Sequence, residues 1–281
     1  MSLSQIILNL RVRNELTKQL GYDDIFGMQK SHAMSDFSKW EPRPERLELA
    51  ADEIHVWRAY LELAEEGILL RQLEETLSTD EKARANRFFF RRDRRHFIAT
   101  RGMLRELLGG YLNRNPKGIE FGYGPQGKPT VHTEPSEQSI QFNVSHSNGM
   151  ALLAFSVGRH LGIDVELVRS FAGEEIAKRY FSPQELMELR QLPAALQNEG
   201  FFLCWTRKEA YIKASGEGLQ IPLKSFQVSL TPGEPARLQT ADGVDWSLRS
   251  LRPDPQYVGA LVAKGKGWRL RGWNWTPPAG H

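Results

Sequence analysis

The chain contains 281 residues, of which 40% are hydrophobic, 25% charged and 10% aromatic. This composition is close to the globular average and excludes collagen, coiled coil and wholesale disorder, while the length allows one large domain or two of ordinary size. Basic residues exceed acidic residues only by 37 to 34, so the distribution of charge along the chain is more informative than its sum.

Cysteine use and apolar stretches indicate the compartment. Cys204 is the only cysteine, which excludes an internal disulfide and a cysteine-rich zinc site and favours a reducing cytosol. The longest strongly apolar stretch, 150–157, is far shorter than the roughly 20 residues that a spanning helix needs. Residues 1–10 lack the order of charged start, apolar core and cleavage site that marks secretion. We therefore predict a cytoplasmic protein without a membrane partner.

The first part of the chain is predicted to be an appendage followed by a strand and a helix. Residues 1–44 show weak periodicity and end in Glu41-Pro42-Arg43-Pro44, where alternating prolines favour an extended linker. From Ile54 the alternation of apolar residues predicts a strand, and residues 61–70 are interpreted as mixed helix or turn. Ser78 and Glu81 form a capping-box pattern, which predicts a helix or helix pair running to about Leu112.

A strongly basic segment lies within this predicted helix. Between Lys82 and Arg105, nine lysines and arginines stand against one aspartate, a local charge of +8. Phe89, Phe97 and Leu104 are expected to share the buried side while the arginines face solvent. Such a segment attracts phosphates or an acidic macromolecule, and the alternative is a solvated helical face.

The remaining predicted elements alternate between strands and helices. Residues 124–129 form a turn-rich loop, and strands joined by the short connections of hairpins are predicted at 140–144, 150–156 and 161–167. Helices are predicted at 174–180, 182–189 and 198–214, the last ending at Gly216, and further strands at 225–230, 246–251, 257–263 and 268–273. Residues 258–263 echo residues 149–154, which suggests two similar halves within an α+β fold.

Two acidic side chains stand on one face of the strand predicted at 161–167. Successive residues of a strand alternate between faces, so Asp164 and Glu166 emerge together while Ile163 and Val165 point to the other side. Like charges at this spacing repel each other unless a cation lies between them, and Mg²⁺ accepts carboxylates while leaving positions for phosphate oxygens. The pattern indicates a magnesium site, with a solvent-facing polar strand as the alternative.

A second group of functional candidates falls on the helix predicted at 198–214. Trp205, Glu209 and Lys213 occur at intervals of four residues and are expected to share one helix face. Glu209 could complete the metal site, and Lys213 could bind a phosphate as a compact positive charge. The alternative is an exposed Glu–Lys pair that contributes only about 0.2 to 0.5 kcal/mol to stability.

The segment Phe142-Asn143-Val144-Ser145-His146-Ser147 carries a serine next to a histidine. Adjacent strand residues point to opposite faces, so Ser145 and His146 are poorly placed to form a hydrolase dyad. The segment also lacks a Gly-x-Ser-x-Gly elbow. His146 is instead interpreted as a phosphate donor, with a capped turn at the strand end as the alternative.

Taken together, these segments resemble a known enzyme family. They are similar in kind, order and separation to the motifs of the 4′-phosphopantetheinyl transferase superfamily. The segments that carry the resemblance are Gly127-Lys128-Pro129, Phe142–Ser147, Gly162–Glu166 and Trp205–Lys213, followed by Gly216-x-Gly218-Leu219. The resemblance is to its larger, pseudo-dimeric type, which activates surfactin synthetase, and it covers about residues 54–263. It implies an α+β fold of two similar subdomains with the active site in the cleft between them.

We divide the chain accordingly. An N-terminal extension with a proline linker is expected at residues 1–44, an N-terminal subdomain at 45–160, a C-terminal subdomain at 161–270 and a tail at 271–281.

The resemblance also implies the reaction. The phosphopantetheine arm of coenzyme A (CoA) is transferred to a serine of an apo acyl or peptidyl carrier protein, which releases adenosine 3′,5′-bisphosphate in a Mg²⁺-dependent step. Asp164, Glu166 and Glu209 then correspond to the metal ligands, and Lys213 to a contact of the CoA diphosphate. The residues expected to bind CoA are Arg84, Arg87, Arg101, Lys128, Pro129, Ser145, His146 and Lys213.

Two residues are candidates for the catalytic base. Glu209, directly or through a metal-held water, is the first candidate for the catalytic base, and Lys208 is the second. The expected partners are CoA and an acidic carrier protein, with no nucleic acid, and the protein is expected to be a monomer.

Two alternatives stay open. One is a metal-dependent nuclease or phosphodiesterase built on the same carboxylates, although the usual acidic-x-Lys order is reversed at Lys208-Glu209. The other is a non-enzymatic nucleic-acid-binding module built on the arginine-rich helix.

Overall fold

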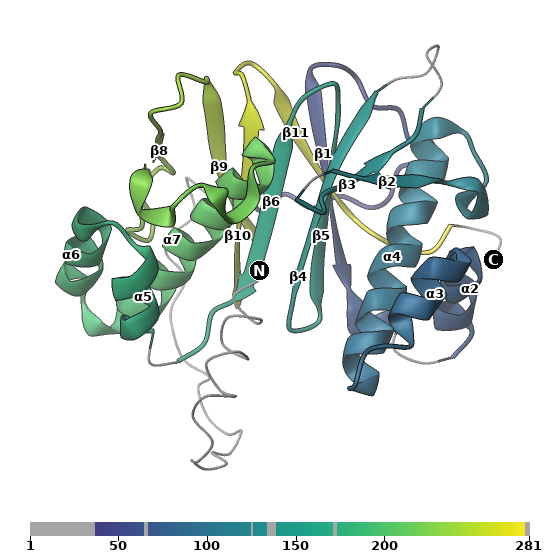
Figure 1. The fold of residues 1–281 in the computed structure, drawn as a ribbon, viewed down its shortest axis with the longest axis horizontal. Helices are drawn as coiled ribbons and strands as arrows, with labels where there is room; N and C mark the ends of the chain where they lie inside the picture. Colours follow the sequence, from purple (N-terminus) through teal and green to yellow (C-terminus); the bar gives the residue numbers. More distant parts are fainter. Residues whose placement is uncertain (1–36, 65–66, 125, 134–138, 171–172, 279–281) are drawn as a thin grey trace.

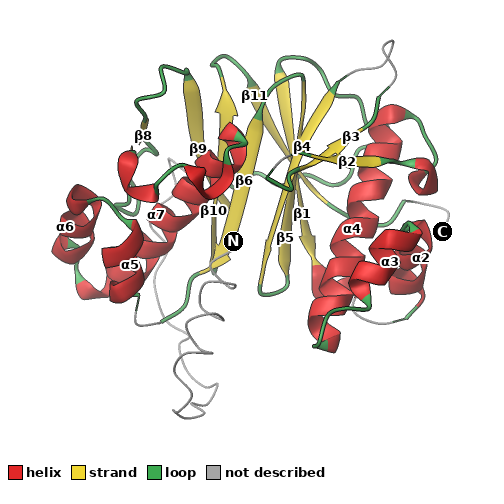
Figure 2. Cartoon of the chain, viewed as in Figure 1, coloured by secondary structure: helices red, strands yellow, loops and turns green. Residues whose placement is uncertain are grey.

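Two β-sheets pack face to face in the middle of the molecule, and a long helix covers the outer face of each (Figure 1). The computed structural model describes residues 37–64, 67–124, 126–133, 139–170 and 173–278. Most of the predicted N-terminal extension, residues 1–36, lies outside these ranges. Figure 2 shows the strands in the centre, with the helices of the first half on one side and those of the second half on the other.

The elements follow one another through both halves of the chain. The first sheet has the strand order β11-β1-β5-β4 and contains β1 (Glu53–Tyr60), β4 (Ile140–Ser147), β5 (Met150–Val157) and β11 (Arg269–Asn274). The second sheet has the order β6-β10-β9 and contains β6 (Leu161–Leu167), β9 (Trp246–Asp254) and β10 (Tyr257–Lys264). Short ribbons pair β2 (Phe121–Tyr123) with β3 (Pro129–Val131) and β7 (Gln227–Val228) with β8 (Leu238–Gln239). The helices are α2 (Ile68–Thr76), α3 (Thr79–Ala85), α4 (Arg91–Leu112), α5 (Glu174–Tyr180), α6 (Pro183–Gln191) and α7 (Ala194–Ser215).

The two halves repeat one topology, as the sequence echo suggests. In each half the first strand is followed by a helix of 22 residues, α4 or α7, and the three strands then lie in the order first, third, second. The prediction of an α+β fold with two similar halves is therefore confirmed. Among the described helices, none is both long enough and apolar enough to cross a membrane.

The last strand connects the two halves. β11 runs parallel to β1 and joins the first sheet, so the chain returns to its N-terminal half, and the division suggested at residue 270 falls inside this strand. Residues 37–44 also connect the two halves. Phe37 forms a β-bridge with Leu251 in β9 of the second sheet, and Glu41 forms one with Trp273 in β11 of the first sheet.

Apolar side chains fill three layers. The middle layer lies between the sheets and is built from alternate residues of their strands, among them Ile54, Val56, Leu152, Ile163 and Leu261, all fully buried. Helix α4 buries its apolar side against the other face of the first sheet, and α7 does the same on the second sheet. Because Ile163 and Val165 point into the middle layer, Asp164 and Glu166 of the same strand point toward α7.

The basic segment folds as a helix pair, with two differences from the prediction. The capping box of Ser78 and Glu81 starts α3, and α4 begins separately at Arg91. Phe89 lies in the connection between these helices and is 92% exposed, because it stands outside the helical register that buries the apolar side of α4. Arg101 and Arg105 were expected to face solvent but are buried, because both guanidinium groups pair with the carboxylate of Glu81.

The prediction that β5 and β6 form a hairpin is wrong. β5 lies between β1 and β4, so both of its edges are already paired and a further neighbour has no place. The chain therefore crosses to the second sheet, where β6 pairs antiparallel with β10. This crossing places β6 next to β4, and the two strands belong to different sheets.

Gly162 allows α7 to lie directly against β6. A Cβ atom at this position would stand 2.2 Å from the carbonyl oxygen of Ala210 and 2.3 Å from the amide nitrogen of Ala214, both in the α7 backbone. We expect Gly162→Ala to lower the free energy of unfolding by about 1 to 3 kcal/mol, because helix and strand must separate. Urea denaturation measures this change, and Gly118→Ala, where a Cβ meets nothing within 4 Å, is the control. Equal stability of both variants would contradict the close approach.

Candidate active site

A ladder of polar side chains joins β4 to β6 across the gap between the sheets. Asn143, Ser145 and Ser147 alternate along β4, so they share one face, and all three are buried. The backbone N–H of Ile163 donates to Oδ1 of Asn143 (2.9 Å). Ser145 Oγ donates to Asp164 (2.7 Å), and Ser147 Oγ donates to Glu166 (2.6 Å). The ladder holds Asp164 and Glu166, two of the three predicted metal ligands, by their carboxylate oxygens.

Lys213 stands beside the first of these carboxylates. Its Nζ atom lies 2.6 Å from Asp164 Oδ1, and it also donates to Ser145 Oγ (3.2 Å) and to the carbonyl of Ile163 (3.1 Å). Burial alone would lower the pKa of Lys213, but the carboxylates of Asp164 and Glu209 outweigh burial and raise it. The ammonium group is therefore charged when it meets a ligand.

Glu209 lies one turn before Lys213 and is buried on the same side of α7. Its Oε1 atom, like Asp164 Oδ2, is buried and has no hydrogen-bond partner in the described part of the chain. Burial, reinforced by the charge of Asp164, raises the pKa of Glu209 to about 7 and that of Glu166 to about 8. Three acidic side chains from β6 and α7 thus share one poorly solvated region.

The side chains of Asp164, Glu166 and Glu209 are not arranged as a complete set of metal ligands. Among residues 37–64, 67–124, 126–133, 139–170 and 173–278, no group of three or more acidic, histidine or cysteine side chains is arranged to hold a metal ion. The positive charge next to Asp164 is supplied by Lys213.

A cavity of about 310 Å³ opens beside Glu209 and Lys213. Its lining comes from both halves of the chain and consists of Gln126, Gly127, Lys128, Pro129, Asn143, Glu209, Ile212, Lys213, Gly216 and Gly218. The predicted CoA-binding residues Lys128 and Pro129 therefore lie at the same cavity as Glu209 and Lys213. Lys128 Nζ itself donates to the carbonyls of Leu161 (2.9 Å) and Lys213 (2.7 Å), so its ammonium group joins the loop to β6 and α7.

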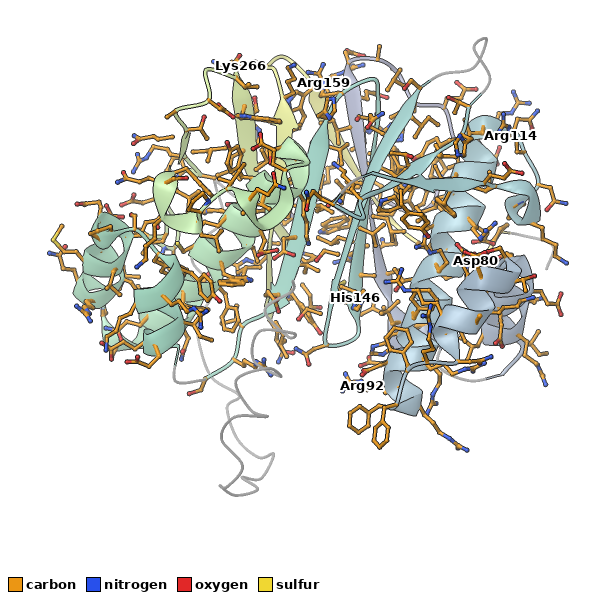
Figure 3. All side chains as sticks on the ribbon, viewed as in Figure 1. Asp80, Arg92, Arg114, His146, Arg159 and Lys266 are labelled. Atoms are coloured by element: carbon orange, nitrogen blue, oxygen red, sulfur yellow. The ribbon has the colours of Figure 1, made fainter. Side chains whose placement is uncertain are left out.

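The other predicted CoA contacts are spread around the first half. His146 is exposed on the side of β4 opposite Ser145, near the first turns of α4 (Figure 3). Arg84 and Arg87 are exposed at the end of α3, with the Arg84 guanidinium 5.3 Å from the Phe97 ring. Arg101 is buried against Glu81 and over the ring of Phe121, which removes it from a surface position.

Lys208 does not lie at the site. Its side chain is fully buried in the second half, with Nζ 2.8 Å from Glu185 and bonded to the carbonyls of Leu223 (2.7 Å) and Phe226 (2.9 Å). All three contacts come from elements outside the cleft, so Lys208 has no path to a bound substrate. The prediction of Lys208 as an alternative base is therefore corrected. Trp205 is likewise a core residue, packed on Phe201 and Tyr180.

Two further residues of the site were absent from the predictions. Ser147 holds Glu166, and Asn143 ties β4 to β6 and lines the cavity. The signal for both was present in the sequence, because Asn143, Ser145 and Ser147 alternate with Phe142 and Val144, a pattern that places the three polar residues on one strand face.

Comparison with known proteins assigns the family. Residues 160–262 match the model of the 4′-phosphopantetheinyl transferase superfamily, and residues 69–157 match the model of the 4′-phosphopantetheinyl transferase N-terminal domain. The 4′-phosphopantetheinyl transferase HetI of Nostoc sp. is 45% identical over 84% of this chain and 98% of its own length. The chain belongs to the 4′-phosphopantetheinyl transferase superfamily. The resemblance read from the motifs and the transferase activity that it implies are confirmed.

Other relatives lie further away. The 4′-phosphopantetheinyl transferase Sfp of Bacillus subtilis is 28% identical over 66% of this chain and 82% of its own length. Among solved structures, a holo-(acyl-carrier-protein) synthase from Bacillus anthracis in complex with CoA (3′,5′-ADP) is 19% identical with a TM-score of 0.34, covering 37% of this chain and 94% of that chain.

Proposed function

We propose that the chain transfers the phosphopantetheine arm of CoA to a serine of an apo carrier protein, with Asp164, Glu166 and Glu209 holding Mg²⁺ and Lys213 binding the diphosphate. The observation that supports this most directly is the pair of buried carboxylate oxygens, Asp164 Oδ2 and Glu209 Oε1, which have no hydrogen-bond partner among the described residues. Buried oxygens of this kind fit a hard cation, which takes carboxylate ligands.

The transfer reaction requires positive charge near the diphosphate of CoA. When a serine oxygen attacks the β-phosphorus of CoA, negative charge grows on the nonbridging and leaving oxygens. Mg²⁺, when bound, would neutralise part of that charge and orient the diphosphate. Lys213 supplies a second positive charge from α7, held in place by Asp164, Ser145 and the carbonyl of Ile163.

The serine must also lose its proton. Glu209 is the proposed base, because its carboxylate lines the cavity that the serine must enter and burial raises its pKa to about 7. Ser145 and Ser147 hold the neighbouring carboxylates, so the ladder from β4 fixes the positions of Asp164 and Glu166 relative to α7.

The rest of CoA is proposed to bind across both halves. Lys128 and Pro129 line the cavity, and His146, Arg84 and Arg87 offer positive or polar groups on the side of the first half. Because one chain contributes both walls, we also propose that the protein acts as a monomer, in the cytoplasm, where its buried Cys204 thiol stays reduced.

The transfer is tested with the purified protein, Mg²⁺, CoA and a panel of apo acyl and peptidyl carrier proteins. We expect at least one carrier to gain the mass of one phosphopantetheine, and the gain to disappear when EDTA removes the metal. Intact-protein mass spectrometry measures both. No gain on any carrier, together with metal-dependent cleavage of DNA or RNA, would instead support the nuclease alternative.

A further inference from the structure

An exposed aromatic surface marks the connection between α3 and α4. Phe88, Phe89 and Phe90 fill this connection and are 37%, 92% and 58% exposed. Phe89 and Phe90 meet edge to face with ring centroids 5.0 Å apart, and Phe88 leans on Phe97. Adjacent exposed aromatic rings on a surface are typical of an interaction site, since aromatic residues are enriched in the centres of protein interfaces.

Arginines flank these rings on both sides. Arg87 precedes them, and Arg91 and Arg92 open α4; all three are exposed, and the first turn of the helix holds a single acidic residue, Asp93. Positive side chains at this end of a helix are disfavoured by its dipole, and exposed rings keep apolar area in water. An acidic partner with an apolar face would relieve both effects. We refer to residues 87–92 as the aromatic–basic patch.

The patch lies at the end of the molecule where Ser147 of β4 holds Glu166. His146 directly precedes Ser147 on β4. The Tyr257 hydroxyl donates to the carbonyl of Asn148 (2.5 Å), in the turn that follows Ser147. Ser147 in turn donates to Glu166. Figure 3 shows Arg92 and His146 at this same end of the molecule.

We propose that the aromatic–basic patch is the docking surface for the carrier protein, and this rests on the proposed function. The arginines would bind acidic side chains of the carrier, while Phe89 and Phe90 pack against an apolar face of it. Charge complementarity favours an acidic partner. The position favours the carrier in particular, because its serine must enter the cleft, and the patch lies at the same end of the molecule as His146 (Figure 3).

The test uses two double variants of the full chain, Arg91→Glu with Arg92→Glu and Phe89→Ser with Phe90→Ser. Arg87 is left unchanged because it is a predicted CoA contact. We expect either variant to raise KM for the apo carrier by about tenfold or more, as for the central residues of an interface. KM for CoA and kcat at saturating carrier should stay within about twofold, because none of the four substituted residues is assigned to CoA binding or to the cleft. The charge-reversed variant should also lose most of the salt dependence of the carrier KM.

Matched controls come from the second half. Lys224→Glu and Met187→Ser change an exposed charge and an exposed apolar side chain far along the chain from the patch, and both KM values should stay unchanged. An unchanged carrier KM in both patch variants overturns the proposal. Loss of binding to phosphatidylserine–phosphatidylcholine vesicles in the Phe89/Phe90 variant, with an unchanged carrier KM, also overturns it and identifies a membrane contact. Failure of the unmodified chain to modify any carrier is a different result, because it defeats the proposed function itself.

Discussion

Replacing Asp164 with alanine is expected to lower kcat/KM for phosphopantetheine transfer by at least about a thousandfold, the scale on which single charge-stabilising groups act. Two contributions disappear together. The buried Oδ2 atom, which has no hydrogen-bond partner in the described chain, is lost as a metal ligand. Oδ1, which holds Lys213 at 2.6 Å, no longer fixes the ammonium group that faces the diphosphate. Mass spectrometry of the carrier under single-turnover conditions measures the rate.

A second readout separates the two contributions. Mg²⁺ binding to the CoA-loaded protein, followed by calorimetry, should weaken in Asp164→Ala. In Lys213→Met it should persist, while the affinity for CoA falls. Asp245→Ala is the control, because Asp245 is exposed and pairs only with the surface residue Lys266 among the ion pairs of the described chain. Transfer by Asp164→Ala within about tenfold of the unmodified rate would contradict a direct role for this carboxylate.

The parts of the site that depend on strand alternation could be predicted from the sequence. Asp164 and Glu166 share a face because they are two residues apart in a strand, and the apolar Ile163 and Val165 between and beside them show which face is buried in the core. The interval of four residues between Glu209 and Lys213 likewise places both on the side of α7 that meets β6. Local periodicity was sufficient in both cases.

The parts that depend on long-range contacts could not be predicted. Arg101 belongs to a basic run that favours exposure, and only the fold brings the capping residue Glu81 close enough to bury it. The close packing of α7 on β6 requires Gly162, but the sequence does not say which helix approaches a glycine. The pairing of β6 with β10 joins residues that are 90 to 102 positions apart, from Tyr257 with Leu167 to Ala263 with Leu161, and the loops between them give no sign of it.

The position of Lys208 also depends on long-range contacts that the sequence does not reveal, although Lys208 is adjacent in sequence to the site residue Glu209. It directly precedes Glu209, but one helical position is a turn of about 100°, so its side chain points toward α6 and the segment 223–226 rather than the cleft. There Glu185 serves two purposes, since it accepts from the N–H groups of Ser182 and Val228 as well as pairing with Lys208. The Lys208–Glu185 pair is thus a structural element of the second half.

We therefore expect Lys208→Ala to lower the free energy of unfolding by about 3 to 5 kcal/mol, the usual effect of removing one partner from a buried ion pair. The carboxylate of Glu185 and the carbonyls of Leu223 and Phe226 would lose their shared donor. Urea denaturation measures the change. Lys208→Met combined with Glu185→Gln should be less destabilising than Lys208→Ala, because no buried charge is left alone. If the role of Lys208 is structural, the fraction of Lys208→Ala that is folded at low temperature should have the kcat of the unmodified protein. A large loss of kcat without a loss of stability would instead make Lys208 a candidate base again.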